Sequence, residues 1–179
     1  MSTTQKLVYN SFLIALSILA TRLFSFMIPL GGIGALRLGF GPVPIILSGV
    51  LFGPLWGGLA GLAGDLLGFA LNPMGSAFLP QVTVVAVLTG VIPGFLLRNK
   101  RKPSFGDFLM AVGISQVVLR ILVMPWILHK TFGVPLWVNV PLRLLTQVVL
   151  IPSYTILVSN LYRALTTYLT TSVVRSSSD

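Results

Sequence analysis

Six long apolar stretches, separated by short breaks that carry glycine, proline or charge, limit how this chain can fold. A helix needs about 20 mainly apolar residues to cross a hydrocarbon layer roughly 30 Å thick. The second stretch is too short to cross as a straight helix, and its surroundings are rich in glycine and proline. Short or broken helices persist at membrane depth only where protein or a cavity satisfies their backbone groups, so we expect this region to line a cavity. The stretches cover residues 7–29, 43–53, 55–71, 78–97, 105–128 and 139–166.

Composition indicates a membrane protein rather than a water-soluble one. The 179 residues are 55% hydrophobic and 8% charged, with a mean hydropathy of +0.96, which leaves too few charged groups for an ordinary aqueous surface. We predict an all-α integral membrane protein, a six-segment transmembrane helical bundle that forms a single domain over residues 1–179. The net charge of +9 does not indicate nucleic-acid binding, because the basic residues are dispersed among apolar stretches or gathered in one short cluster.

That basic cluster sets the predicted orientation. It reads RNKRKP at residues 98–103, between the fourth and fifth segments. Loops that carry such clusters lie on the cytoplasmic side of a membrane. With six crossings, both termini are then cytoplasmic as well, and we expect a multi-pass protein of the cell membrane.

Four arginines fall within or just beside the apolar stretches. An arginine at the centre of a membrane-spanning helix costs about 2.5–3.5 kcal/mol on insertion scales, so it normally faces a cavity or a partner. The predicted orientation places all four in the outward half of the bundle, although those nearest the segment ends could also reach the outer headgroups. Only three acidic residues are available to neutralise them, and an anionic ligand would supply the missing charge. The arginines are Arg22, Arg37, Arg120 and Arg143.

The three acids differ in their predicted roles. Asp65 is the one inside a predicted span; it could be a structural partner of an arginine, a neutral carboxyl or a hydrogen-bond acceptor for a ligand. Asp107 follows the basic cluster and is expected to cap the fifth segment. Asp179 is the last residue of the sequence.

Small residues form two flat helix faces. One lies on the third segment, at Gly57, Gly61 and Gly64, and is expected to pack inside the bundle. The other lies on the first segment, at Ser11 and Ala15. It could serve as a docking surface for another membrane protein.

The sequence argues against an enzyme. It has no cysteine and one histidine, so a metal site or a nucleophile with its base has few residues to draw on. It also lacks the G-x-x-x-x-G-K-[ST] pattern of phosphate-binding loops. We expect no cofactor and no metal, and any ATP hydrolysis must come from a partner.

Residues 38–97 resemble a known family. They contain a Pro-Ile-Ile-Leu run, Phe-Gly-Pro, Gly-Asp-Leu-Leu-Gly, Asn-Pro-x-Gly and a later Thr-Gly. This pattern resembles the substrate-binding S components of energy-coupling factor (ECF) vitamin transporters, in the folate family. A departure from the pattern lies at residues 79–83, which read LPQVT where relatives tend to have FPGFT.

The resemblance implies a vitamin-binding subunit of an ABC-type importer. Such a subunit takes up a vitamin from outside and delivers it with a transmembrane coupling subunit and two cytoplasmic ATPase subunits. The small face of the first segment, with Ser11 and Ala15, matches the position where the family meets its coupling subunit.

Folate is the ligand that the candidate residues favour, because it is a dianion with a flat pterin ring. Arginine forks bind carboxylates, Asp65, Asn72 and Gln81 could read the pterin edge, and an aromatic side chain could stack on the ring. Each aromatic could equally belong to a lipid-facing belt or the core. Pantothenate, with one carboxylate and no ring, is the alternative ligand, and a structural membrane assembly subunit is the alternative outside transport. The aromatic candidates are Phe78, Trp126 and Trp137.

Overall fold

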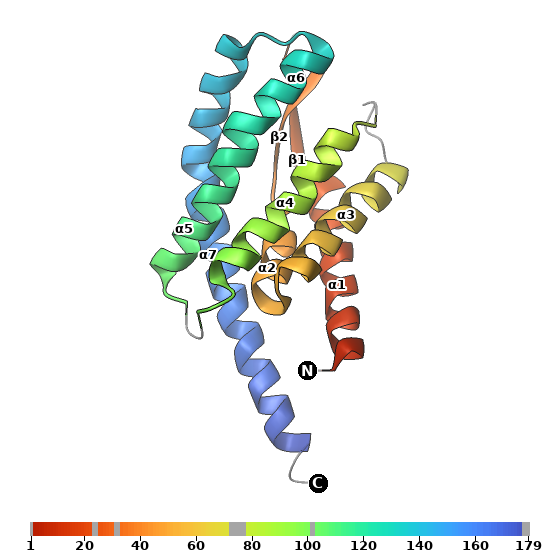
Figure 1. The fold of residues 1–179 in the computed structure, drawn as a ribbon, viewed down its shortest axis with the longest axis vertical. Helices are drawn as coiled ribbons and strands as arrows, with labels where there is room; N and C mark the ends of the chain where they lie inside the picture. The colour runs from red at the N-terminus through yellow and green to blue at the C-terminus, as the bar shows by residue number, and fades with distance from the viewer. Residues whose placement is uncertain (1, 23–24, 31–32, 72–77, 101–102, 177–179) are drawn as a thin grey trace.

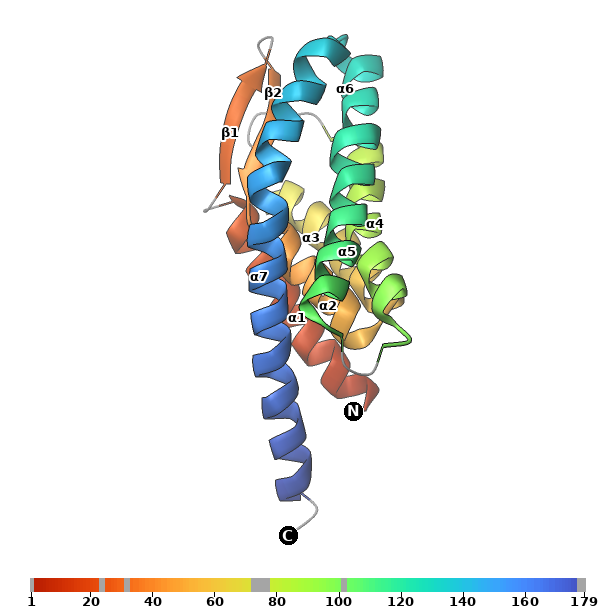
Figure 2. The same ribbon diagram turned by 90° about the vertical axis from the view of Figure 1, so that its left-hand side faces the viewer.

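The computed structural model describes residues 2–22, 25–30, 33–71, 78–100 and 103–176. Helices make up most of it, and an antiparallel pair of strands follows the first helix (Figures 1 and 2). In chain order the elements are α1 (Thr3–Arg22), β1 (Ser25–Leu30), β2 (Ile33–Gly39), α2 (Pro42–Phe52), α3 (Pro54–Leu71), α4 (Pro80–Leu97), α5 (Phe105–Gln116), the π-helical stretch η1 (Val117–Val123), α6 (Met124–Phe132) and α7 (Leu136–Ser176).

The helical bundle confirms the predicted fold class. Within the described residues, four helices are long and apolar enough to cross a membrane, and α2 is a shorter apolar helix, as predicted for the second segment. α1 has 20 residues but is less apolar, because it carries Lys6 and Arg22 and several polar side chains. The four spans are Pro54–Leu71, Pro80–Leu97, Phe105–Phe132 and Asn139–Thr167.

The short helix α2 lies at the centre of the bundle. Its residues 43–49 are all buried, because neighbouring helices surround it on every side. Ile46 and Leu47 join the largest apolar cluster, together with Phe108 of α5 and Val158 of α7. A helix this short can remain in the interior because α1, α3, α4 and α7, rather than lipid, pack against it.

Glycines allow α2, α3 and α4 to approach to backbone contact. A Cβ added to Gly57 would lie 2.6 Å from the Gly90 carbonyl oxygen, and one added to Gly61 would lie 2.2 Å from that of Ala86. The predicted internal packing of the small face on α3 is confirmed at these two positions. Close helix contact through small residues is the usual way in which membrane helices associate.

The first predicted segment, residues 7–29, is wrong in its second part. The helix ends at Arg22, and Ser25–Leu30 instead forms β1, which pairs antiparallel with β2. Pro29 has no amide hydrogen for a helix and is better accommodated in a two-stranded edge. Arg37, expected in an outer loop, therefore lies on β2 opposite Met27. The hairpin lies toward the same end of the molecule as the beginning of α7 (Figures 1 and 2).

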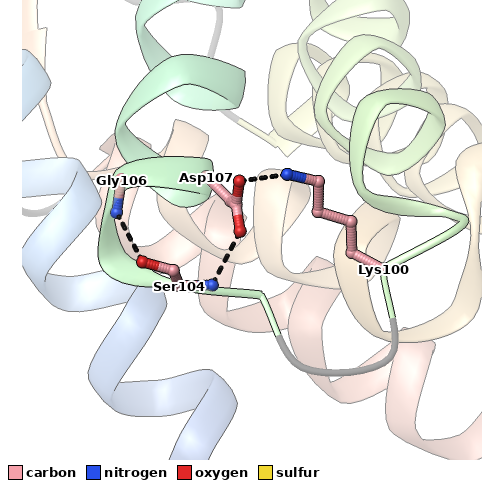
Figure 3. A network of polar contacts seen from close by, with 4 residues as sticks. All are labelled: Lys100, Ser104, Gly106 and Asp107. Carbon is pink, nitrogen blue, oxygen red and sulfur yellow. Dashed lines mark hydrogen bonds and ion pairs between the residues drawn. The ribbon is translucent and has the colours of Figure 1, made fainter.

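The fifth span begins with a capping box, shown in Figure 3. The Asp107 carboxylate accepts from the Ser104 amide at 2.8 Å, and the Ser104 hydroxyl accepts from the Gly106 amide at 3.4 Å. Lys100 forms an ion pair with Asp107. The predicted capping role of Asp107 is confirmed, and the ion pair ties the start of α5 to the residues that follow the end of α4.

Candidate functional site

A cavity of about 110 Å³ lies between α1, α2, α3, α4, η1 and α7. Apolar residues of α2 and α4 form part of its wall, and most of its polar lining comes from the other elements. A second hollow, of about 430 Å³, lies where α2 meets α3 and α4 ends, and it contains none of the predicted binding residues. The polar residues of the first cavity are Ser17, Thr21, Arg22, Asp65, Thr89, Arg120, Arg143, Thr146, Gln147 and Tyr154.

Three of the four predicted arginines line this one cavity. Arg22 is the last residue of α1, Arg120 lies within η1, and Arg143 lies in the second turn of α7. Arg143 is only 3% exposed, and its Nε donates to Asn139 Oδ1 at 2.7 Å. Arg120 is near enough to Arg143 for the two charges to repel each other. Two like charges that line one cavity of an apolar bundle favour an anion between them.

Asp65 supplies the acidic group of the cavity. Its Oδ2 accepts from Thr83 Oγ1 of α4 at 2.7 Å, and its charge attracts the Arg22 guanidinium. The Arg22 side chain extends over Gly68, where an added Cβ would lie 3.2 Å from Nη2. Of the three roles predicted for Asp65, this arrangement fits a partner of Arg22.

Two hydrogen bonds connect the residues at the end of β2 to the helices α7 and α1. The Tyr154 hydroxyl of α7 donates to the Gly39 carbonyl at the end of β2 at 2.6 Å. Ser17 Oγ of α1 donates to the Gly41 carbonyl at 2.9 Å. Gly39 and Gly41 themselves line the cavity. The connection from β2 to α2 is therefore fixed on both sides, by α7 and by α1.

A family model described as ECF-type riboflavin transporter, S component, matches residues 1–167, nearly the whole chain. The chain belongs to this S-component family. The predicted resemblance is thereby confirmed, and the protein is a multi-pass membrane subunit of a transporter and not an enzyme.

Individual relatives agree with the family. This S component is 33% identical over 158 residues to the folate transporter FolT of Clostridium novyi (strain NT), an alignment that covers 88% of each protein. A crystal structure of FolT bound with folic acid superposes with a TM-score of 0.73 at 25% identity and covers 87% of this chain and 90% of that one. The structure of an S component of a bacterial ECF transporter gives 0.68 at 25% identity, with 94% and 99% covered.

Four of the predicted ring-binding residues of this S component do not line the cavity. Phe78 is 43% exposed and packs on Phe69, with ring centroids 5.2 Å apart. Trp126 is 54% exposed, and Lys130 lies over its ring. Gln81 and Trp137 are also exposed. Exposed aromatic side chains near span ends suit the membrane interface, the alternative that the sequence left open for them.

Two predicted residues cannot be placed in the site. Asn72 lies outside the described residues, and only the backbone position of Arg37 on β2 is described. Their proposed contacts with a ligand remain predictions.

Sequence reasoning missed one face of α7 that lines the cavity. Arg143, Gln147, Leu150 and Tyr154 follow one another at spacings of four, three and four residues, which is the period of one helix face. Extending the helical period from Arg143 would have found Gln147 and Tyr154.

The predicted docking residues lie on the outside of the bundle. Ser11 and Ala15 are both exposed on α1, one helical turn apart. Ser11 Oγ donates to the Leu7 carbonyl at 2.9 Å, so the hydroxyl is folded back against its own helix. The face between these residues is therefore flat and presents little polarity, as close helix packing requires.

Proposed function

We propose that this S component binds folate and delivers it to an ECF-type importer. The observation that carries the proposal is the convergence of Arg22, Arg120 and Arg143 on a single cavity inside an apolar bundle. Folate has two carboxylates to offset this charge. The folate transporter FolT is a relative at 33% identity, and FolT with folic acid is a structural neighbour.

Within the cavity, Arg120 and Arg143 are the candidates for binding the carboxylates. Arg22 already has the attraction of Asp65, whereas Arg120 and Arg143 repel each other. A carboxylate placed between them would accept charge-assisted hydrogen bonds and relieve that repulsion. Asp65, the partner of Arg22, would hold that arginine at the wall of the cavity.

Riboflavin and pantothenate are the competing ligands. The name of the matched family mentions riboflavin, but riboflavin is neutral and would leave Arg120 and Arg143 without an anion. Pantothenate has one carboxylate and no flat ring. The arginine pair therefore supports folate over riboflavin, and the size of its charge supports folate over pantothenate.

The transport partners in this proposal are a transmembrane coupling subunit and two cytoplasmic ATPase subunits. The protein would need no cofactor of its own, because the ATPase subunits consume the ATP. Ser11 and Ala15 would dock on the coupling subunit. Both termini and the basic cluster at residues 98–103 would face the cytoplasm.

Calorimetric titration of the detergent-purified protein tests the choice of ligand. Folate, riboflavin and pantothenate are titrated separately into the same preparation. We expect one-to-one binding of folate that is at least about 100-fold tighter than that of the other two. Binding of riboflavin or pantothenate alone would retain the family and overturn the ligand, while no binding of any of the three would favour a structural subunit.

A further inference from the structure

The second hollow, of about 430 Å³, lies well apart from the cavity that holds the arginines. The ring of Phe52 in its lining stacks on Tyr9 of α1, with centroids 6.4 Å apart. Arg22, at the other end of the same helix, lines the first cavity. From Tyr9 to Arg22 the helix rises about 20 Å, at about 1.5 Å per residue. The hollow is therefore a separate site.

The hollow lies where two membrane spans end. The span Pro54–Leu71 begins in its lining, and the span Pro80–Leu97 ends there. Residues at the ends of such spans lie at the boundary between the hydrocarbon and the lipid headgroups. The lining also contains Trp56 and Tyr162, and these two residue types are enriched at that depth. The position of the hollow therefore suits a lipid headgroup.

The charged residues of the lining, Arg98 and Lys100, are both basic. Arg98 directly follows α4, is exposed, and forms no ion pair with any described residue. Lys100 pairs with Asp107 (Figure 3), and 49% of its side chain is exposed. An exposed ion pair contributes little energy, and an ammonium group has three donors. Both side chains can therefore donate to an anion in the hollow.

Membrane topology alone explains the sign of these charges but not the space beside them. Basic residues favour one side of a membrane, and a cation at the end of a helix also interacts with the helix dipole. Neither effect requires a hollow. Here a Cβ added to Gly53 would meet no described atom within 4 Å, and Leu55 is 77% exposed beside it. Open space between apolar walls and two cations matches an amphiphile with an anionic head.

We propose that this hollow binds the headgroup of an anionic phospholipid. Arg98 and Lys100 donate to the phosphate, and Leu55 lies alongside the first part of an acyl chain. Basic pockets between transmembrane helices bind anionic headgroups in the same way. A lipid with a net negative charge, such as phosphatidylglycerol, is preferred over zwitterionic phosphatidylcholine. The site does not depend on which vitamin the protein binds, because the two hollows share no lining residue.

Lipid titration of the detergent-purified protein tests the site. Phosphatidylglycerol and phosphatidylcholine with the same acyl chains are added separately. Native mass spectrometry counts the bound lipids, and thermal unfolding measures stabilisation. We expect one phosphatidylglycerol per protein, and at about tenfold its dissociation constant a melting temperature about 3–6 °C higher than with phosphatidylcholine. Equal binding and equal stabilisation by the two lipids would overturn the proposal.

Arg98→Gln removes a charge of the site and retains a polar side chain. It should weaken phosphatidylglycerol binding by about fivefold, the usual effect of one basic residue on an anionic lipid. Arg98→Glu, which reverses the charge, should abolish the preference over phosphatidylcholine. Both variants should bind folate as the wild type does, because Arg98 does not line the first cavity. Phosphatidylglycerol affinities within twofold of the wild type in both variants would overturn the site.

The matched control is Arg163→Gln, at an exposed arginine of α7 that follows Tyr162 but is not part of the lining. It should leave phosphatidylglycerol binding unchanged. An equal loss in Arg163→Gln and Arg98→Gln would overturn the site, because it would indicate a general attraction to a basic surface. Inorganic phosphate in large excess should not displace the lipid, since it has no acyl chain. Displacement by phosphate would make the hollow a site for a soluble anion and overturn the lipid assignment.

Discussion

At the scale of single residues, Arg120 offers the sharpest test of the charged site. Hydrogen bonds to charged groups contribute about 1.5–3 kcal/mol, so Arg120→Ala should weaken folate binding by about 10- to 150-fold. The protein should still fold, because the substitution also removes the repulsion between Arg120 and Arg143. Calorimetry measures the affinity, and size-exclusion chromatography in detergent measures folding.

Arg163→Ala is the control for this substitution. Arg163 is an exposed residue of α7 that lies outside the cavity, so its loss should change neither affinity nor folding. If Arg120→Ala abolished expression while the little protein obtained still bound folate normally, Arg120 would have a structural role.

The residues that sequence could predict are those whose chemistry conflicts with lipid. Arg22, Asp65 and Arg143 stood out because a charge in an apolar stretch needs an explanation, and the structure brings them to one cavity. Gln147, which also lines the cavity, was not predicted, because an uncharged amide conflicts with lipid less than a charge does. The aromatic candidates Phe78 and Trp126 failed to reach the cavity because an aromatic side chain suits the membrane interface as well as a binding site.

At the scale of elements, the contact between α3 and α4 depends on Gly90. A Cβ added there would lie 2.2 Å from the Gly57 carbonyl oxygen, and a backbone atom cannot move aside as a side chain can. Gly90→Ala should therefore lower the free energy of unfolding by about 1–3 kcal/mol or more. Thermal unfolding in detergent, followed by intrinsic fluorescence, measures the loss.

Gly113→Ala is the matched substitution in α5. Its added Cβ would meet Ile151 at an ordinary contact distance of 3.9 Å, so the melting temperature should hardly change. Equal losses in the two variants would show that helix geometry, and not the α3–α4 contact, determines the effect.

Tyr154 should control how long a ligand stays in the cavity. Its hydroxyl bonds the Gly39 carbonyl at 2.6 Å, and a hydrogen bond of this kind contributes about 0.5–1.5 kcal/mol. Tyr154→Phe should therefore increase the rate of folate dissociation by about 2- to 10-fold, which stopped-flow fluorescence can follow. Tyr162→Phe, further along α7 where the ring packs on Phe108, should leave the rate unchanged. An unchanged rate in Tyr154→Phe would mean that the hydrogen bond between Tyr154 and Gly39 does not affect release.

Segment prediction succeeded where hydropathy was strong and failed where two structures compete. Residues 55–71 and 105–128 closely match α3 and the span Phe105–Phe132. Residues 25–30 are apolar enough to continue a helix, and only Pro29 argues against it. They pair with β2, at residues 33–39. These residues lie between the first two predicted segments and were therefore expected to form a loop. To predict this hairpin, both strands, β1 and β2, would have to be recognised together.

At the scale of the whole molecule, binding and docking occupy different surfaces. The cavity is lined by α1, β2, α2, α3, α4, η1 and α7, whereas the small face of α1 points outward. α1 begins and α7 ends toward the same end of the molecule (Figure 1), as the predicted topology requires. Separate surfaces mean that a substitution can disable transport without affecting the ligand.

Ala15→Phe should separate the two functions. A bulky ring on the flat face of α1 prevents the close approach that small residues allow between membrane helices. We expect folate affinity within twofold of the wild type, because Ala15 does not line the cavity. Folate uptake, measured with radiolabelled folate in cells or proteoliposomes that contain the coupling module, should fall to the background level.

The control adds bulk to another exposed face of the same protein. Leu122 on η1 is exposed and does not line the cavity, so Leu122→Phe should retain both binding and uptake. Co-purification with the coupling subunit distinguishes the reasons for a loss of uptake. If Ala15→Phe still co-purified with that subunit and took up folate normally, the docking surface would have to lie on another helix, whereas loss of uptake without loss of binding would place it on α1.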